Sequence, residues 1–190
     1  VTNVENKIGE YFGNGKRFGV SIKYATQKDP QGAGDALLLA GKYITGDFFL
    51  LNASHVDTEA FIKDLQKLKE KGGKAVLLAK NKAGGVLQGI LKFKGNKVDE
   101  IIEKPKAATS PYLGVVGIYL FAKDFLETLG RAPKEHYQLE KAISLYAKNN
   151  SVLFHKTLKE TVSLKYPWDL LSAKNYLFKN LKRSIGKKQK

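Results

Sequence analysis

A polar loop with one proline and two glycines, residues 27–35, joins two apolar segments and restricts the fold more than any other feature. The apolar run Phe18–Ala25 before the loop alternates like a strand, and the small apolar residues Ala36–Ala40 after it begin a helix. Such a loop lets backbone N–H groups approach a flat or anionic ligand closely. Because many α/β proteins carry a glycine turn at this place, the loop predicts an α/β fold and leaves the function open.

Strand-like and helix-like segments alternate along the chain. Helices are expected where apolar residues recur every three or four positions, and strands where apolar runs are short or alternate with polar residues. The expected helices are residues 4–12, 36–42, 58–71, 124–129, 138–148 and 167–182, and the expected strands are 20–24, 48–51, 75–79, 86–93, 97–102, 112–121 and 152–155. This order predicts one domain over residues 1–182, with a Rossmann-like, mostly parallel sheet flanked by helices, an antiparallel insertion around residues 84–121, and a basic tail at residues 183–190.

The composition is that of an ordinary globular protein and excludes several kinds of site. Of the 190 residues, 43% are hydrophobic and 27% are charged. The chain has no cysteine, which excludes disulfides and thiolate metal sites, and no apolar run approaches the roughly 20 residues that span a bilayer. Residues 1–10 are polar and lack the pattern of a signal peptide. We therefore expect a cytoplasmic protein without membrane contact.

A formal net charge of +15, from 33 basic and 18 acidic side chains, favours anionic partners such as nucleotides, sugar phosphates or nucleic acid. The three arginines, Arg17, Arg131 and Arg183, are few for a protein that reads DNA bases, because arginine is the usual bidentate ligand of guanine. Nucleic-acid binding therefore stays open as a general electrostatic interaction. The basic tail is equally consistent with a solvated helix end.

Several short motifs follow one another in an order that identifies a family. They are Ile8-Gly9-Glu10-Tyr11-Phe12-Gly13-Asn14-Gly15, Phe18-Gly19-Val20, Gln27 with Gly32, Asp47-Phe48-Phe49-Leu50-Leu51-Asn52, Glu103-Lys104-Pro105, Gly117-Ile118-Tyr119 and Pro167-Trp168-Asp169-Leu170-Leu171. With them the chain resembles the sugar-phosphate nucleotidylyltransferases, in particular the glucose-1-phosphate thymidylyl- and uridylyltransferases, over about residues 8–178. The resemblance implies a nucleotide-diphospho-sugar transferase fold. It also implies a reaction in which a sugar 1-phosphate attacks the α-phosphorus of a nucleoside triphosphate, with Mg²⁺ held by carboxylates.

The resemblance also assigns ligand-binding roles. Gln27 stands where the family's glutamine reads the edge of a pyrimidine through its amide, and Gly32 stands where the base packs against the backbone. Glu103 and Lys104 stand where a carboxylate contacts sugar hydroxyls and an ammonium contacts phosphate. Each of these residues also has a structural interpretation, as a surface glutamine, a turn glycine or an exposed ion pair. The positions expected beside the sugar are Gly89 and Gly117, with Tyr119 either on the floor of the sugar pocket or in the core.

The metal site of the family is not matched. The two aspartates that hold Mg²⁺ in the family correspond to Ser54 and Ser163, and the glycine after the second one corresponds to Lys165. A neutral hydroxyl is a poor substitute for a carboxylate on Mg²⁺, so we expect a degenerate metal site and can name no catalytic residue. The family's opening G-x-G-T-R loop has no counterpart after Val1, so the resemblance is to a domain that is incomplete at its N-terminus.

Two residues beside Ser54 have structural interpretations. Asp57 is expected to cap the following helix or to lie in its first turn, and His55 is expected to be a hydrogen-bonded structural residue. The sequence offers no Ser/His/Asp constellation with a spacing usable for catalysis, and no H-E-x-x-H motif.

Three functions remain open from the sequence. The first is a nucleotidylyltransferase-like protein that binds a pyrimidine nucleotide or nucleotide-sugar and is degenerate in catalysis. The second is an inactive regulatory subunit that pairs with itself or with an active homologue. The third is a basic protein associated with nucleic acid, which bulk charge alone supports.

Overall fold

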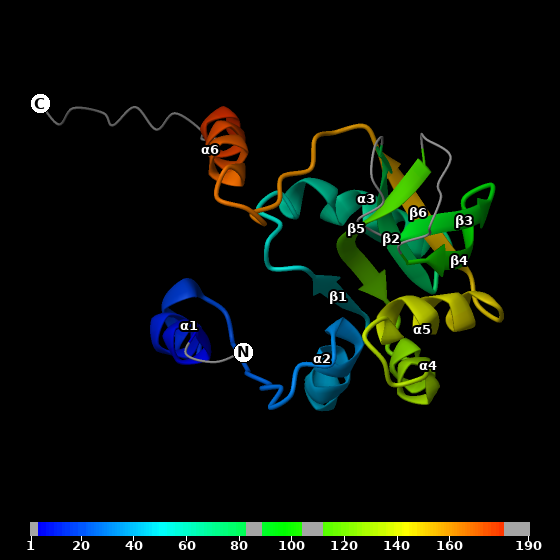
Figure 1. Cartoon of the computed structure of the whole chain (residues 1–190), viewed down its shortest axis with the longest axis horizontal. Helices are drawn as coiled ribbons and strands as arrows, with labels where there is room; N and C mark the ends of the chain where they lie inside the picture. The colour runs from blue at the N-terminus through cyan, green and yellow to red at the C-terminus, as the bar shows by residue number, and fades with distance from the viewer. Residues whose placement is uncertain (1–3, 83–88, 104–111, 181–190) are drawn as a thin grey trace, which may run out of the picture.

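The computed structural model describes residues 4–82, 89–103 and 112–180, which form a mixed sheet with helices on both faces (Figure 1). The helices are α1 (Val4–Phe12), α2 (Ala33–Ala40), α3 (Glu59–Glu70), α4 (Phe125–Arg131), α5 (Gln138–Ala147) and α6 (Asp169–Asn180), with short 3₁₀ turns η1 (Lys16–Phe18) and η2 (Gly41–Tyr43). The strands are β1 (Phe48–Leu51), β2 (Ala75–Lys82), β3 (Ile90–Lys94), β4 (Lys97–Ile102), β5 (Tyr112–Phe121) and β6 (Val152–Thr157). No helix in these ranges is long and apolar enough to cross a membrane.

The sheet has the strand order β1-β5-β2-β6-β4-β3, and a further pairing of β3 with β5 closes it on itself. Strands β2 and β6 are parallel, whereas β5 is antiparallel to β1 and β2, its neighbours on either side. The expectation of a mostly parallel sheet is therefore wrong, because β5 inserts between the two strands and reverses the direction on either side. The antiparallel insertion is confirmed for the hairpin β3–β4, whose turn residue Gly95 has a φ of 61°.

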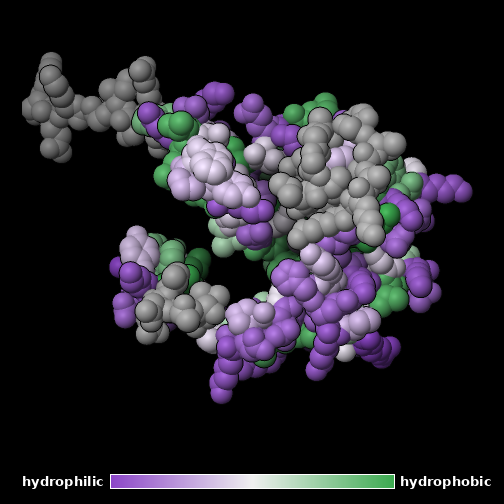
Figure 2. All heavy atoms as spheres, viewed as in Figure 1, coloured by the Kyte–Doolittle hydropathy of each residue, from purple (hydrophilic) through white to green (hydrophobic). Residues whose placement is uncertain are grey.

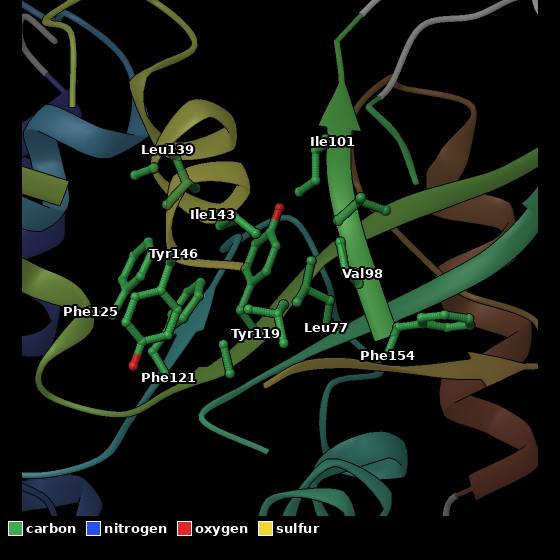
Figure 3. Packing of buried hydrophobic residues seen from close by; sticks show 14 of the residues in the cluster. Leu77, Val98, Ile101, Tyr119, Phe121, Phe125, Leu139, Ile143, Tyr146 and Phe154 are labelled. Atoms are coloured by element: carbon green, nitrogen blue, oxygen red, sulfur yellow. The ribbon is translucent and has the colours of Figure 1, made fainter. Parts of the chain in front are cut away.

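Two apolar clusters lie on opposite faces of β2 and β5. On one face, Phe61 and Leu65 of α3 are fully buried against Val76 and Ile118, which explains why the apolar spacing of this segment gives a helix. On the other face, α2, α4 and α5 cover a larger cluster (Figure 3). In it the rings of Phe121 and Phe125 stack with their centroids 4.1 Å apart. The central strands are thus buried on both faces.

The segment between α1 and α2 departs from the sequence expectation. Residues 20–24 were expected to form a strand, but the structure has none there. Within the described ranges, the amides of residues 23–27 make no backbone hydrogen bond. Alternation of apolar residues favours an extended backbone, but a strand also needs a neighbouring strand to accept its hydrogen bonds. In the described ranges this segment pairs with no strand, and the amides of Val20 and Ile22 bond to the nearby carbonyls of Gly15 and Asn14.

The same region leaves apolar surface uncovered. Among the described strands, β1 pairs with β5 alone, so its other edge is open. Helix α1 stands apart from the sheet, and Figure 2 shows an open space with apolar residues along its borders. Tyr11, Phe12 and Phe18 contact one another there and remain 40–61% exposed. An unpaired strand edge beside exposed aromatic rings is unusual for an isolated domain.

The other expected elements are confirmed where the structure describes them, with ends that shift by a few residues. The expected strand at 86–93 is seen from Ile90 onward, and residues 86–88 lie outside the described ranges. The tail at 183–190 and Lys104 also lie outside them.

Candidate functional site

A cavity of about 680 Å³ opens where the end of β1 meets the middle of β5. Its walls come from the loop after β1, the end of β4, the first turn of α5, and residues 161–169, which return across the sheet before α6. A second cavity of about 500 Å³ adjoins it and shares the residues Asn52, Gly117, Tyr119 and Glu140. The face of α2 lines this second cavity with small side chains, including Ala33 and Ala36.

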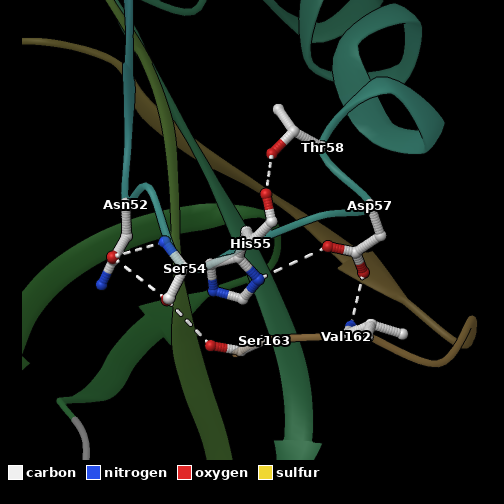
Figure 4. Close-up of polar contacts among 7 residues, drawn as sticks. All are labelled: Asn52, Ser54, His55, Asp57, Thr58, Val162 and Ser163. Carbon is white, nitrogen blue, oxygen red and sulfur yellow. Dashed lines mark hydrogen bonds and ion pairs between the residues drawn. The ribbon is translucent and has the colours of Figure 1, made fainter. Parts of the chain in front are cut away.

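Ser54 and Ser163, at the positions where the resemblance expects aspartates, face each other in the first cavity (Figure 4). Residues His55 and Ser163 form an isolated antiparallel bridge, closed by the bonds Val56 N–H to Val162 O and Leu164 N–H to Ser54 O. This bridge brings the Oγ atoms of Ser54 and Ser163 to 2.8 Å. Asn52 Oδ1 accepts from the backbone N–H of Ser54 at 3.2 Å and from its hydroxyl at 3.1 Å.

His55 and Asp57 lie beside the serine pair. The Nδ1 atom of His55 is 3.4 Å from Oδ1 of Asp57, and the side chain of Asp57 is fully buried. The other carboxylate oxygen of Asp57 accepts the Val162 N–H at 2.7 Å. The expectation that Asp57 caps α3 or lies in its first turn is therefore wrong, since α3 begins at Glu59 and the Asp57 carboxylate bonds a segment 105 residues away.

The structure places Ser54, His55 and Asp57 near one another and brings Ser163 to them, although no hydrogen bond among the described residues joins His55 to either serine. In Figure 4 the imidazole of His55 lies between Asp57 on one side and Ser54 and Ser163 on the other. His55, Ser54 and Ser163 all line the cavity. The sequence places Ser54, His55 and Asp57 within four residues, but it could not reveal Ser163 as their neighbour, because an antiparallel bridge between distant segments brings it there.

The opposite part of the cavity wall is acidic. Glu103 lies over Gly89, where an added Cβ would come within 2.9 Å of Glu103 Oε2. Glu140, in the first turn of α5, also lines the cavity, and its burial raises the pKa of its carboxyl group while nearby His136 opposes the rise. Burial, and then the charges of Glu140 and Glu103, raise the pKa of Tyr119, which is 8% exposed. Tyr119 is thus both a core residue and a cavity wall, and Glu140 is a candidate that the sequence analysis missed.

The predicted nucleotide residues lie elsewhere. Gln27 donates through Nε2 to Asp35 Oδ2 at 2.6 Å and to Gly32 O at 3.2 Å, at the start of α2. Gly32 has a φ of 105°, and a Cβ there would lie 2.6 Å from His136 O, so glycine is required. Neither residue lines the first cavity, whereas the predicted sugar residues Gly89, Glu103 and Gly117 do. The nucleotide role of Gln27 and Gly32 stays a prediction.

The donor set at the serine pair does not fit Mg²⁺. The oxygens that gather there come from two hydroxyls and one amide, and the carboxylate of Asp57 accepts from Val162 and faces His55. Mg²⁺ prefers carboxylate oxygens in octahedral geometry. In the ranges that the structure describes, no three His, Asp or Glu side chains cluster in a way that could hold a metal ion.

A family model described as nucleotidyl transferase matches residues 2–166. The chain belongs to this nucleotidyl transferase family. The match contains both serines of the bridge and every lining segment of the first cavity except its last residue, Asp169.

Curated relatives and solved structures agree with this assignment. The protein is 30% identical over 168 residues to a bifunctional protein GlmU of Methanococcus aeolicus, and 29% identical over 186 residues to that of Methanocaldococcus jannaschii. These matches include 86% and 95% of this chain but 40% and 43% of the relatives, so the chain spans about two fifths of their length.

Two solved structures share the fold at low sequence identity. A Bacillus anthracis protein assigned as a glucose-1-phosphate thymidylyltransferase, in complex with a sucrose, has a TM-score of 0.77 at 19% identity, covering 96% of this chain and 74% of its own. An apo UDP-glucose pyrophosphorylase has a TM-score of 0.72 at 17% identity, covering 94% and 74%. The chain therefore has the α/β fold of sugar-phosphate nucleotidyltransferases.

Proposed function

We propose that this nucleotidyl transferase family member binds a sugar phosphate or a pyrimidine nucleotide-sugar and is degenerate in nucleotidyl transfer. The observation that carries the proposal is the hydrogen bond between Ser54 and Ser163, at the two positions where the family resemblance expects metal-binding aspartates. Family membership supports the ligand class, and the loss of both carboxylates argues against a Mg²⁺-dependent transfer step.

The charge distribution of the cavity suits such a ligand. Carboxylates accept hydrogen bonds from sugar hydroxyls, and Glu103 and Glu140 offer them at one part of the wall. Hydroxyl, imidazole and ammonium groups suit phosphate, and Ser163, His55 and Lys165 line the other part. The nucleoside would extend toward the second cavity, which α2 borders. Gly32 directly precedes α2, and Gln27 bonds to its carbonyl oxygen.

The experiment is a ligand-dependent thermal shift of the full chain with UTP, dTTP, glucose 1-phosphate and the matching nucleotide-sugars. A ligand at 100 times its Kd stabilises the folded state by about 2.7 kcal/mol, which gives a measurable rise in Tm. Glu103→Gln should weaken binding of the sugar-containing ligands by about tenfold or more, the usual effect of losing a charged hydrogen bond.

The matched control is Glu100→Gln, on β4, because Glu100 pairs with Lys92 at 2.9 Å on the exposed face and does not line the cavity. The proposal is wrong if no nucleotide, sugar phosphate or nucleotide-sugar raises Tm at millimolar concentration. Steady release of pyrophosphate from UTP and glucose 1-phosphate in the presence of Mg²⁺ would contradict the degenerate assignment while leaving the ligand class intact.

A second candidate keeps the same ligand but places the chain as a partner of an active homologue. The open edge of β1 and the exposed rings of Tyr11, Phe12 and Phe18 favour it, because both leave surface that another chain can cover. A change in the turnover of a catalytically complete relative on addition of this chain would support it. The nucleic-acid interpretation has the net charge alone behind it.

A further inference from the structure

We propose that Ser163, held in place by Ser54, and His55 bind a phosphate oxyanion directly, with no divalent cation. The inference rests on the proposed function, because the phosphate would be that of a sugar phosphate or of the diphosphate in a nucleotide-sugar. It goes beyond that function by assigning the phosphate to a group of side chains that do not include the acidic residues of the family's metal site.

The hydrogen atoms of the serine pair can be placed from their neighbours. Asn52 Oδ1 accepts the backbone N–H of Ser54, so it is an acceptor at this position and the Ser54 hydroxyl donates to it. The Ser54 oxygen must then accept in its 2.8 Å contact with Ser163, which makes the Ser163 hydroxyl the donor. Rotation of this hydroxyl alone turns its proton into the cavity. An arriving anion can therefore replace the Ser54 oxygen as the acceptor of this proton.

His55 supplies the second contact. Its Nδ1 lies 3.4 Å from the buried carboxylate of Asp57, whose other oxygen is fixed by Val162 N–H. The carboxylate favours a proton on the ring nitrogen that faces it. The other ring nitrogen, Nε2, then faces the side of the ring where the two serines lie (Figure 4), where it can share a proton with a phosphate oxygen. Asp57 thus positions the ring.

The carboxylates in the same cavity leave this end available to an anion. Asp169 accepts the backbone N–H groups of Lys165 and Tyr166 at 2.8 and 2.7 Å, so its charge is engaged at the start of α6. Glu103 lies over Gly89, and Glu140 lies close enough to Tyr119 to raise its pKa. Lys165 also lines the cavity, two residues after Ser163, and adds a positive charge to this wall. The serine and histidine end therefore presents hydroxyl, imidazole and ammonium groups to a ligand.

The test is isothermal titration of the full chain in EDTA and again in Mg²⁺, with inorganic phosphate, pyrophosphate, glucose 1-phosphate and UDP-glucose as probes. We expect at least one of the phosphate probes to bind with the same affinity in EDTA and in Mg²⁺. His55→Gln and Ser163→Ala should each weaken that binding by about tenfold to a hundredfold, the range for a charge-assisted hydrogen bond. Comparison of glucose 1-phosphate with UDP-glucose identifies which source supplies the phosphate.

Two controls make the result specific. His155→Gln alters a histidine that also faces a carboxylate, Asp64 at 3.8 Å, but lies outside the cavity, and it should bind as the parent does. The double variant Ser54→Asp with Ser163→Asp should lose affinity in EDTA and regain it in Mg²⁺, because paired carboxylates repel phosphate until a cation joins them. His55→Gln leaves Asp57 unpaired and can fail to fold. In that case Ser163→Ala, which removes one hydroxyl, still tests phosphate binding.

The outcomes separate the two proposals. Binding that requires Mg²⁺ in the parent protein refutes the direct phosphate site. Binding of UDP-glucose that is unchanged in both His55→Gln and Ser163→Ala refutes it as well and leaves the proposed function standing. Binding of none of the probes under either condition refutes both.

Discussion

Gly117 offers the sharpest test of how the fold holds the cavity together. A Cβ added at this position of β5 would lie 2.9 Å from Asn52 Cβ, and both atoms are fixed to the backbone. Packed carbons stay about 3.5–4.0 Å apart, so Gly117→Ala forces the end of β1 away from β5 by about 0.6–1.1 Å. The hydrogen bond from Asn52 N–H to Gly117 O, now 2.8 Å, opposes that movement.

We expect Gly117→Ala to destabilise the protein by about 1–3 kcal/mol, as overpacking commonly does. For a chain of this size the corresponding loss of Tm is about 2–12 °C. Because Asn52 accepts both donors of Ser54, its displacement should also weaken phosphate binding. Differential scanning calorimetry and titration with the probes above measure the two effects.

Gly46→Ala is the matched control, because a Cβ at Gly46 meets nothing within 4 Å. It should leave both Tm and binding unchanged. If Gly117→Ala behaves like Gly46→Ala in both measurements, the close approach of β1 and β5 does not organise the cavity, and the argument from Asn52 to Ser54 fails.

Two further results are expected. Burial raises the pKa of Glu140 above its ordinary value of 4.5, so the folded state binds more protons than the unfolded chain and stability falls as pH rises through the folded-state pKa. Glu140→Gln should therefore be more stable than the parent well above pH 4.5, with a smaller difference below that pH, and it should bind the sugar ligands more weakly. Urea denaturation measures the stability difference. An equal difference at all pH values would show that the fold does not raise the pKa of Glu140. Amide hydrogen exchange should be fast at residues 23–27, whose amides make no backbone hydrogen bond within the described ranges, and slow in β5. Strong protection of residues 23–27 would contradict this unpaired backbone.

The sequence predicted elements whose pattern is local. The spacing of Phe61, Leu65 and Leu68 identifies α3, and the apolar runs at 75–79 and 152–155 identify β2 and β6, because these residues fill the two faces of the sheet. It failed where the outcome depends on a distant neighbour. The segment at 20–24 has the alternation of a strand but meets no partner, and the direction of β5 between β1 and β2 follows from the tertiary arrangement.

The candidate site could also be predicted only in part from the sequence. The resemblance located Gly89, Glu103, Gly117, Ser54 and Ser163, all of which the structure brings to one cavity. It did not locate Glu140, which reads as one polar residue of an amphipathic helix, or the role of Asp57. The Asp57 carboxylate had a plausible local task at the start of α3, and nothing in the sequence reveals the competing bond to Val162.

The serine bridge also explains how this region of the fold can dispense with a cation. Two carboxylates at the 2.8 Å separation of the serine hydroxyls would repel each other unless an ion or a proton joined them. In this chain the return of residues 161–164 across the end of β1 is held by two backbone hydrogen bonds, the uncharged serine pair and the bond from Val162 to Asp57. None of these contacts requires a metal. The serine pair therefore closes the cavity wall without the negative charge that two carboxylates would bring, and a single aspartate introduced at either position would place a carboxylate against the remaining hydroxyl and the His55–Asp57 pair.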